Sequence, residues 1–224
     1  VGYQALLDNT TGADNVAVGF LALTNNTTGG GSVAIGRQAL GNNTTGNNVA
    51  IGKLAAVGNT SGNGNVAIGS FAALYSNQTG SSNIAIGSNA LENNTTANYN
   101  VAIGTSALLN NTTASNNTAV GYQAGYTTNG DSGTFVGHQA GRNNTANNTV
   151  FIGYQTGYNN TGSANTAVGF LSFNANTSGT ANTALGRESL KANTTGVNNI
   201  AIGYQPLLVN TTGSQNISLG TNAL

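Results

Sequence analysis

The side chains that could take part in catalysis are few in this chain of 224 residues, and they do not share a repeated position. The only histidine in the sequence, His138, follows Gly137 at a position that elsewhere holds Tyr, Arg, Lys, Ser or Phe. A catalytic serine needs a histidine base and an orienting carboxylate, and neither partner type recurs with His138. We therefore predict that His138 is a variable, solvent-facing residue.

The acidic residues are equally scattered, at Asp8, Asp14, Glu92, Asp131 and Glu188. No two of them are arranged as a general acid and base, and none has the aspartate spacing of calcium-binding repeat coils. The chain has no cysteine, which excludes thiolate metal sites and disulfides. We predict that the protein is not an enzyme and holds neither a metal nor a cofactor.

The charge composition excludes two classes of partner. Five basic residues balance five acidic ones, and charged residues make up 4% of the chain. Nucleic acid and anionic membrane surfaces both require clustered Lys and Arg, which are absent. No apolar run approaches the length of about eighteen residues that a membrane-spanning helix needs. We therefore expect neither nucleic acid nor membrane contact in this segment.

One chemically distinctive motif does recur, the glycosylation sequon Asn-x-Ser/Thr. The candidate glycosylation sites in the column of Asn-Thr-Thr turns are Asn9, Asn26, Asn43, Asn59, Asn77, Asn94, Asn111, Asn143, Asn159, Asn176, Asn193 and Asn210. One interpretation is turn chemistry, because Asn tolerates left-handed backbone and Thr caps turns. A second is a regular row of glycans, which would keep a nearly uncharged chain soluble. A third is a ladder of threonine hydroxyls that binds ice or carbohydrate.

These motifs sit on a repeat that is marked by a glycine returning every 16 to 18 residues. The glycines are Gly2, Gly19, Gly36, Gly52, Gly69, Gly87, Gly104, Gly121, Gly137, Gly153, Gly169, Gly186, Gly203 and Gly220. Residues 32–48 (SVAIGRQALGNNTTGNN) show the unit most clearly. A fixed period of this length indicates one supersecondary unit stacked upon itself.

The pattern within one unit predicts two short strands and two turns. An aliphatic residue precedes each glycine, and a Val, Ile or Thr lies two residues earlier, which is typical of one face of a strand. A second apolar pair, such as Ala39-Leu40 or Ala107-Leu108, predicts the second strand. Helical repeats need about thirty residues or more. We predict an all-β protein, a parallel β-solenoid of about 13 coils of 16–18 residues.

We expect residues 1–224 to form a single repeat array, a window of a longer chain without capping units. An asparagine before most strands, such as Asn65 or Asn100, is expected to hydrogen-bond along the solenoid axis.

A column of small residues lies between the two aliphatic positions of the first strand. Because side chains alternate along a strand, we predict that this column points away from the core and is covered by a second copy of the chain. The predicted self-association stripe is Ala17, Ala34, Ala50, Ala67, Ala85, Ala102, Ala119, Phe135, Phe151, Ala167, Ala184 and Ala201. Its two phenylalanines predict that the interface between the chains is locally wider or differently packed there.

The repeats also resemble a known family. Residues 117–125 (NTAVGYQAG), 65–69 and 100–104 (both NVAIG) resemble the head repeats of YadA-like trimeric autotransporter adhesins. The full unit, with Ala-Leu and Asn-Asn-Thr-Thr-Gly, is similar to repeat arrays of bacterial and phage tail-fibre-type proteins. This resemblance covers essentially the whole chain. It implies a left-handed, trimeric β-roll exposed on a cell or virion surface. The usual head repeat is shorter, and the family's neck, coiled coil and anchor are not present in this sequence.

The function expected from these observations is structural. We expect an extracellular shaft of a surface fibre, filament or cell-adhesion protein, with the Asn-Thr-Thr turns as candidate glycosylation sites. The expected partner is the chain itself, as a homotrimer or a head-to-tail filament, together with glycans or a host surface. The alternatives are a carbohydrate- or host-receptor-binding module and an ice-binding protein.

Overall fold

The computed structural model describes residues 1–223 and is a β-solenoid built from short parallel strands. The chain divides into two compact units, unit one (Val1–Asn116) and unit two, which begins at Asn117. Unit one contains β1 (Val16–Val18), β2 (Val33–Ile35), β3 (Val49–Ile51), β4 (Val66–Ile68), β5 (Ile84–Ile86) and β6 (Val101–Ile103). Unit two contains β7 (Thr118–Val120), β8 (Thr134–Val136), β9 (Val150–Ile152), β10 (Thr166–Val168), β11 (Thr183–Leu185), β12 (Ile200–Ile202) and β13 (Ile217–Leu219).

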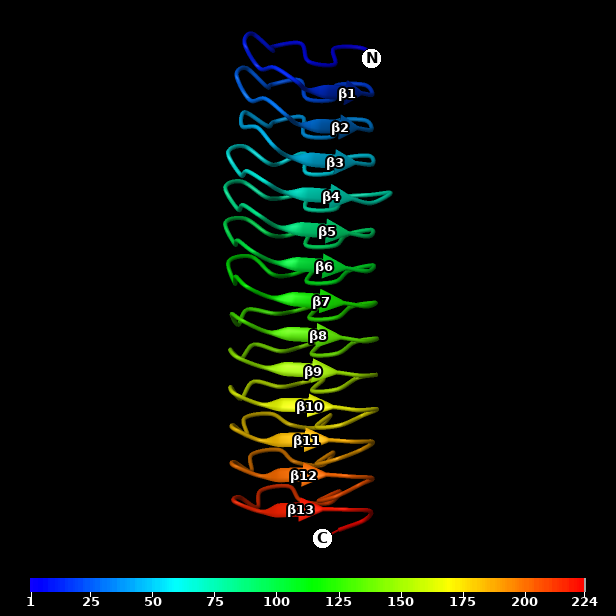
Figure 1. Cartoon of the computed structure of the whole chain (residues 1–224), viewed down its shortest axis with the longest axis vertical. Helices are drawn as coiled ribbons and strands as arrows, with labels where there is room; N and C mark the ends of the chain where they lie inside the picture. Colours follow the sequence, from blue (N-terminus) through cyan, green and yellow to red (C-terminus); the bar gives the residue numbers. More distant parts are fainter. Residues whose placement is uncertain (224) are drawn as a thin grey trace. The chain divides into compact units, whose positions relative to one another are not determined.

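Within each unit, every coil contributes one strand to a single ladder (Figure 1). Consecutive strands pair in parallel and in register, so that Ala34 lies beside Ala50 and Ala50 beside Ala67. The strands of unit two follow the same rule, for example Thr166 beside Thr183. The predicted all-β parallel solenoid is confirmed.

The strands face the opposite way from the prediction. In β3, Ala50 is fully buried and Ile51 is 37% exposed, and the middle residue is the buried one in all thirteen strands. The predicted self-association stripe therefore lies inside the coil, and its assignment as an outer surface was wrong. The buried members are Ala17, Ala34, Ala50, Ala67, Ala85, Ala102, Ala119, Phe135, Phe151, Ala167, Ala184 and Ala201.

The reason for this orientation is the small width of the coil. In the coil around Gly36, the interior holds Ala34, Ala39, Leu40, Asn43 and Asn48, all fully buried. A leucine and two asparagines already fill most of that space. Only a small side chain fits on the inward face of the strand, because protein interiors are close-packed. The larger Val and Ile side chains are left on the outer face.

The second predicted strand is also absent. Ala39 and Leu40 both point inward, whereas neighbouring residues of a strand alternate between faces. The backbone achieves this with left-handed residues, at φ 57° for Gln38 and 50° for Leu40. The segment is still bonded to both neighbouring coils, because the Gln38 amide donates to the Phe20 carbonyl at 2.8 Å and the Leu40 amide to the Ala55 carbonyl at 3.0 Å.

The repeated glycine forms the corner directly after each strand. Gly36 has φ 138°, a region that L-residues rarely adopt. A Cβ atom at Gly36 would lie 2.3 Å from the carbonyl oxygen of Gly52 in the next coil. The corner therefore requires glycine both for its backbone conformation and for the close approach of the next coil.

The two phenylalanines of the buried column are accommodated inside the coil, so that the predicted wider interface between chains was wrong. Phe135 lies where a Cβ atom on Gly141 would come within 2.2 Å of its ring, and one on Gly133 within 2.4 Å. These glycines replace the leucine and the asparagine of other coils. Gly157 likewise makes room for Phe151, since a Cβ atom there would lie 2.5 Å from the ring. In these coils, a larger side chain on the strand is compensated by smaller residues elsewhere in the same coil.

This compensation can be tested with a double-mutant cycle. We expect Phe135→Ala to cost about 3–5 kcal/mol of unfolding free energy because it leaves a cavity. We expect Gly141→Leu alone to be destabilising as well, because Leu would overlap the Phe135 ring. The double variant restores the Ala/Leu pair of other coils, so it should be more stable than the sum of the two changes predicts. Urea unfolding measures all three, and strictly additive losses would contradict the compensation.

Candidate functional site

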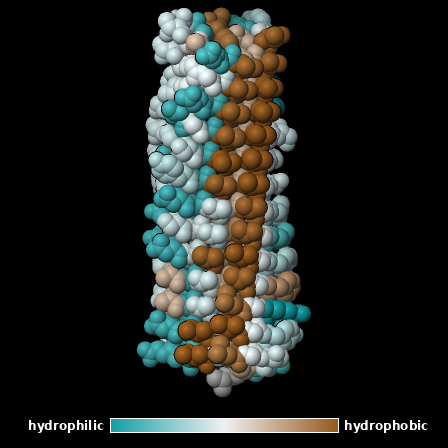
Figure 2. All heavy atoms as spheres, in the orientation of Figure 1, coloured by the Kyte–Doolittle hydropathy of each residue, from teal (hydrophilic) through white to brown (hydrophobic). Residues whose placement is uncertain are grey.

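The first candidate surface is the outer face of the strands of unit one, which we call the aliphatic stripe. It consists of Val16, Val18, Val33, Ile35, Val49, Ile51, Val66, Ile68, Ile84, Ile86, Val101 and Ile103. Every member is partly or fully exposed, and Figure 2 shows the apolar band along the strands. In unit two, four strands begin with threonine, at Thr118, Thr134, Thr166 and Thr183, and the outer face is more polar.

The second candidate surface was the row of Asn-Thr-Thr turns, and its asparagines point inward. Asn77 is fully buried, and its amide donates to the side chain of Asn59 at 2.6 Å and to the Gly80 carbonyl at 2.8 Å. Both amide hydrogens are therefore used inside the coil. The fully buried sequon asparagines are Asn26, Asn43, Asn59, Asn77, Asn94, Asn111, Asn176 and Asn193. Glycosylation of these residues in the folded coil was a wrong prediction, because a glycan needs an accessible amide nitrogen.

The remaining sequon asparagines fall into two pairs. Asn9 and Asn210 are half-buried members of the same inner column, and Asn210 donates to the Gly213 carbonyl at 3.0 Å. Asn143 and Asn159 lie one position earlier in their turns, with the inward place taken by the next residue, such as Asn144. The Asn143 amide donates to the Asn159 side chain at 2.8 Å on the surface. Glycosylation of Asn143 and Asn159 stays a prediction.

The asparagines before the strands form a second internal ladder, as predicted. The Asn65 backbone amide donates to the Asn48 side-chain oxygen at 2.9 Å, and the Asn65 side chain donates to the Gly80 carbonyl at 2.8 Å. Each amide group thus bridges two coils. Because each buried amide finds its partners at fixed positions, these hydrogen bonds favour the observed alignment of one coil on the next over a shifted alignment.

The first threonine of each turn forms a surface ladder. The Thr44 hydroxyl donates to the Thr60 carbonyl at 2.7 Å, and the Thr60 hydroxyl to the Gln78 carbonyl at 2.8 Å. The hydroxyl hydrogens are therefore directed along the axis into the backbone of the next coil. The ladder presents oxygen lone pairs, rather than hydroxyl donors, to solvent.

The third candidate surface is a set of stacked side chains that we call the aromatic wall of unit two. One column holds Tyr122, His138, Tyr154, Phe170, Arg187 and Tyr204, and a second holds Tyr126, Arg142 and Tyr158. His138 is exposed, as predicted, and its ring stacks at 5.2 Å on Tyr122 and at 5.1 Å on Tyr154. The stack continues from Tyr154 to Phe170 at 5.2 Å.

Amide side chains line the wall between these two columns. Gln139 donates to Gln123 at 2.9 Å, and Gln155 donates to Gln139 at 2.8 Å, so that the three glutamines form a ladder. The Arg142 Nε atom donates to the Gln123 side-chain oxygen at 3.1 Å. The wall is therefore polar and aromatic, in contrast to the aliphatic stripe.

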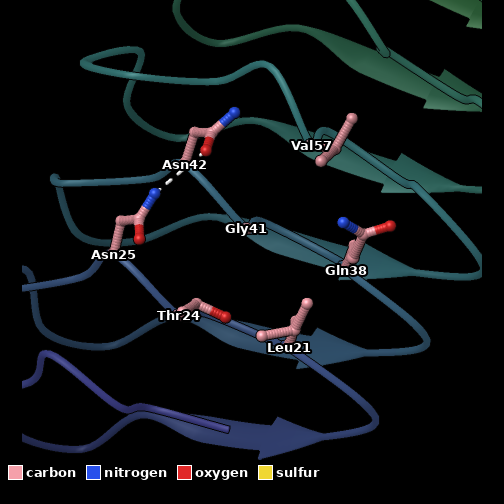
Figure 3. A pocket seen from close by; sticks show the side chains of 7 residues that line it. All are labelled: Leu21, Thr24, Asn25, Gln38, Gly41, Asn42 and Val57. Carbon is pink, nitrogen blue, oxygen red and sulfur yellow. Dashed lines mark hydrogen bonds between the residues drawn. The ribbon is translucent and has the colours of Figure 1, made fainter. Parts of the chain in front are cut away.

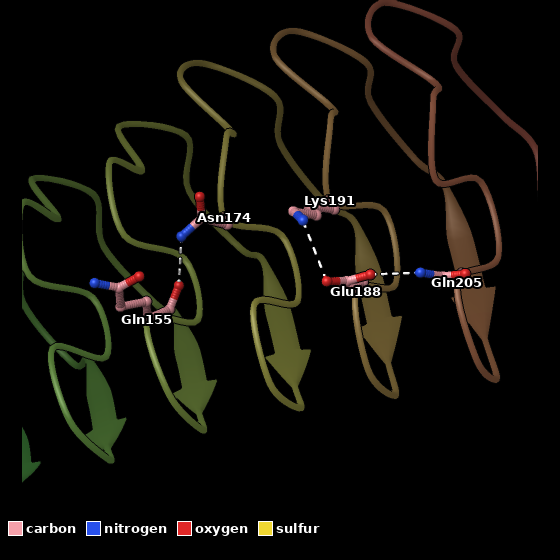
Figure 4. Close-up of polar contacts among 5 residues, drawn as sticks. All are labelled: Gln155, Asn174, Glu188, Lys191 and Gln205. Carbon is pink, nitrogen blue, oxygen red and sulfur yellow. Dashed lines mark hydrogen bonds and ion pairs between the residues drawn. The ribbon is translucent and has the colours of Figure 1, made fainter.

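The ladder on this wall ends in a small polar cluster (Figure 4). Glu188 accepts a hydrogen bond from Gln205 at 2.5 Å and pairs with the Lys191 ammonium group at 3.2 Å. The Gln205 hydrogen bond, followed by the Lys191 contact, lowers the pKa of Glu188 below its ordinary value. Nearby, Asn174 donates to the Gln155 carbonyl at 2.8 Å. The cluster holds one carboxylate in its ionised form.

Unit one has a hollow on the corresponding wall (Figure 3). It lies where Gly41 carries no side chain, between Thr24 of the preceding coil and Val57 of the following coil. Its lining is completed by Leu21, Gln38 and the bonded pair Asn25 and Asn42. The hollow contains no titratable group, so it offers no acid–base chemistry.

Residues 1–223 contain neither a metal-binding cluster nor a helix that could span a membrane. No three His, Cys, Asp or Glu side chains of these residues are grouped so that they could hold a metal ion. The same residues include no helix that is long and apolar enough to cross a membrane. No protein-family model, curated protein or solved structure matches the chain.

The pairing of arginines with aromatic rings was not predicted from the sequence. The signal was present in the spacing, because Tyr126, Arg142 and Tyr158 follow one another at intervals of 16 residues. In a solenoid of that local period, such residues stack directly on one another.

The inner asparagine column provides a stability test. We expect Asn77→Ala to lower the unfolding free energy by about 1–3 kcal/mol for each buried partner left without a hydrogen bond. The matched control is Asn25→Ala, which removes the exposed Asn25–Asn42 contact of 3.0 Å and should cost about 0.5 kcal/mol or less. Urea unfolding compares the two variants. Equal losses would contradict the structural role of the buried column.

Glu188 predicts a pH dependence of stability. Its pKa is lower in the folded state, so its stabilising contribution is present above the unfolded-state pKa and is lost as the pH falls through the folded-state pKa. The Glu188→Gln variant lacks this proton uptake. Its unfolding midpoint in urea should therefore change less than that of the unmodified chain between neutral pH and about pH 3. Identical pH profiles would contradict the assignment.

Proposed function

We propose that this chain is a structural shaft of a fibre or adhesin on a cell or virion surface, self-associated along the aliphatic stripe of unit one. The observation that supports the proposal is the stripe itself. It places two columns of exposed Val and Ile side by side on six consecutive strands. Contiguous apolar surfaces of this kind are rare on monomeric soluble proteins and mark interaction sites.

A second copy of the same chain is the partner that suits this surface best. The stripe carries no charged or hydrogen-bonding side chain that would select a chemically different partner. A second solenoid has the same coil repeat, so that its ridges of Val and Ile fit between those of the first, coil after coil. Burial of the stripe then removes apolar area from water on both chains.

The proposed assembly is a homotrimer of left-handed solenoids, as the resemblance to adhesin head repeats implies. Closed symmetric assemblies are the common form of homo-oligomer, and a head-to-tail filament is the open alternative. A stiff shaft suits the two internal asparagine ladders, which bond each coil to the next.

The stripe can be tested by placing charges on it. We expect Ile51→Lys combined with Ile86→Lys to convert the assembly to monomers without unfolding, because both side chains are exposed in the single chain. The control is Thr28→Lys combined with Thr96→Lys on the exposed turns, which should leave the assembly mass unchanged. Sedimentation equilibrium gives the mass, and circular dichroism verifies the fold. A monomeric unmodified chain, or an unchanged mass in the stripe variant, would refute the proposal.

A further inference from the structure

Two arginines of unit two are held in an unusual way, each between two aromatic rings. The Arg142 guanidinium lies 4.8 Å from the Tyr126 ring and 5.7 Å from the Tyr158 ring. The Arg187 guanidinium lies 5.5 Å from Phe170 and 5.6 Å from Tyr204. Neither arginine forms an ion pair with an acidic side chain within residues 1–223.

This arrangement determines where a ligand can bind. Rings occupy both faces of each guanidinium, and the N–H donors lie in its plane, so the edge of the group is the part left for a ligand. The Arg142 Nε atom donates a hydrogen bond to the Gln123 side chain at 3.1 Å, and Nη1 donates to the Asn143 side chain at 3.3 Å. These two bonds orient the guanidinium group further. A guanidinium edge that is already oriented binds a carboxylate in two parallel hydrogen bonds with little loss of entropy.

The charge of the wall favours an anion. Arg142, Arg187 and Lys191 are the only basic Lys or Arg residues of the sequence beyond residue 116, and all three lie on this wall. The carboxylate of Glu188 on the same wall is bound by Lys191 and Gln205. Arg187 also acts on this carboxylate and contributes to lowering the pKa of Glu188, but three cations face one carboxylate, so that the wall keeps an excess of positive charge.

The polar groups between and beside the arginines favour a polyhydroxylated ligand. The Gln123, Gln139 and Gln155 ladder offers amide groups once per coil, and exposed tyrosines such as Tyr154 add phenol groups. An extended sugar chain running along the axis would meet an amide group at each of these three successive coils. Nucleic acid is less well suited, because its density of phosphates calls for many more cations than this wall has.

We propose that the aromatic wall of unit two binds an extended anionic polysaccharide, with sugar carboxylates on the guanidinium edges of Arg142 and Arg187 and sugar hydroxyls on the glutamine ladder. This goes beyond the structural role and does not rest on the aliphatic stripe, which lies in unit one.

The experiment is isothermal titration of the full chain with an alginate oligosaccharide, a chain of uronic acids, and with a neutral cello-oligosaccharide of equal length. We expect binding of alginate that weakens with added salt, and much weaker binding of the neutral sugar. Arg142→Gln and Arg187→Gln should each reduce the alginate affinity about tenfold, since a charged hydrogen-bonded pair is lost. Absence of alginate binding, or equal binding of the neutral sugar, would overturn the proposal.

Two further variants separate recognition by the guanidinium edge from simple charge attraction. Arg37→Gln in unit one is the matched control, because Arg37 lies over one ring only, at 5.9 Å from Phe20, and alginate affinity should be unchanged. Arg142→Lys keeps the charge but not the planar donor edge, so affinity should still fall. Retention of full affinity in Arg142→Lys would refute the edge contact. Thermal unfolding of each variant verifies the fold. An unchanged assembly mass would show that a loss of alginate binding does not come from a loss of self-association.

Discussion

The narrow interior of the coil is the constraint on which the other features depend. In the coil around Gly36, the interior encloses Leu40 and two asparagines, which leaves room for only a small residue on the inward face of the strand. Alanine meets this demand, and where Phe135 replaces it, Gly133 and Gly141 give up the corresponding volume. The outward position of Val and Ile, and thus the aliphatic stripe, is a consequence of that limit.

Buried asparagine is the second consequence of the same geometry. A buried amide without partners would be costly, but stacking identical coils gives each amide a partner in the next coil. Asn59 and Asn77 illustrate this, since the second donates to the first at 2.6 Å. The asparagine of a motif that matches a glycosylation signal in the sequence therefore serves to hydrogen-bond neighbouring coils to each other. The hydroxyl of the neighbouring threonine also donates along the axis, but in the opposite direction, from Thr60 to the Gln78 carbonyl of the following coil.

Exact repetition also explains how the two units come to differ in surface chemistry. A residue placed at one column contacts its counterparts in the coils on either side, so a few substitutions at a fixed spacing create a continuous surface. In unit one, Val and Ile keep the outer strand face wholly aliphatic. In unit two, Tyr, His and Arg at intervals of 16 residues form stacked columns, exemplified by Tyr126, Arg142 and Tyr158. The two proposals rest on these separate surfaces.

The sequence alone determined the repeat, the β-solenoid class and the axial asparagine ladder, because these depend on period and residue type. The facing of the strand was predicted wrongly, with the alanine column pointing outward. Alternation allows either Ala50 or its neighbours Val49 and Ile51 to point inward, and hydrophobicity by itself favours the larger pair. Only the tertiary structure decided between them, because the free volume inside a coil depends on what Leu40 and the asparagines occupy from the other walls. For the same reason, only the stacking of coils in the tertiary structure shows which asparagines are enclosed and which arginines lie between rings.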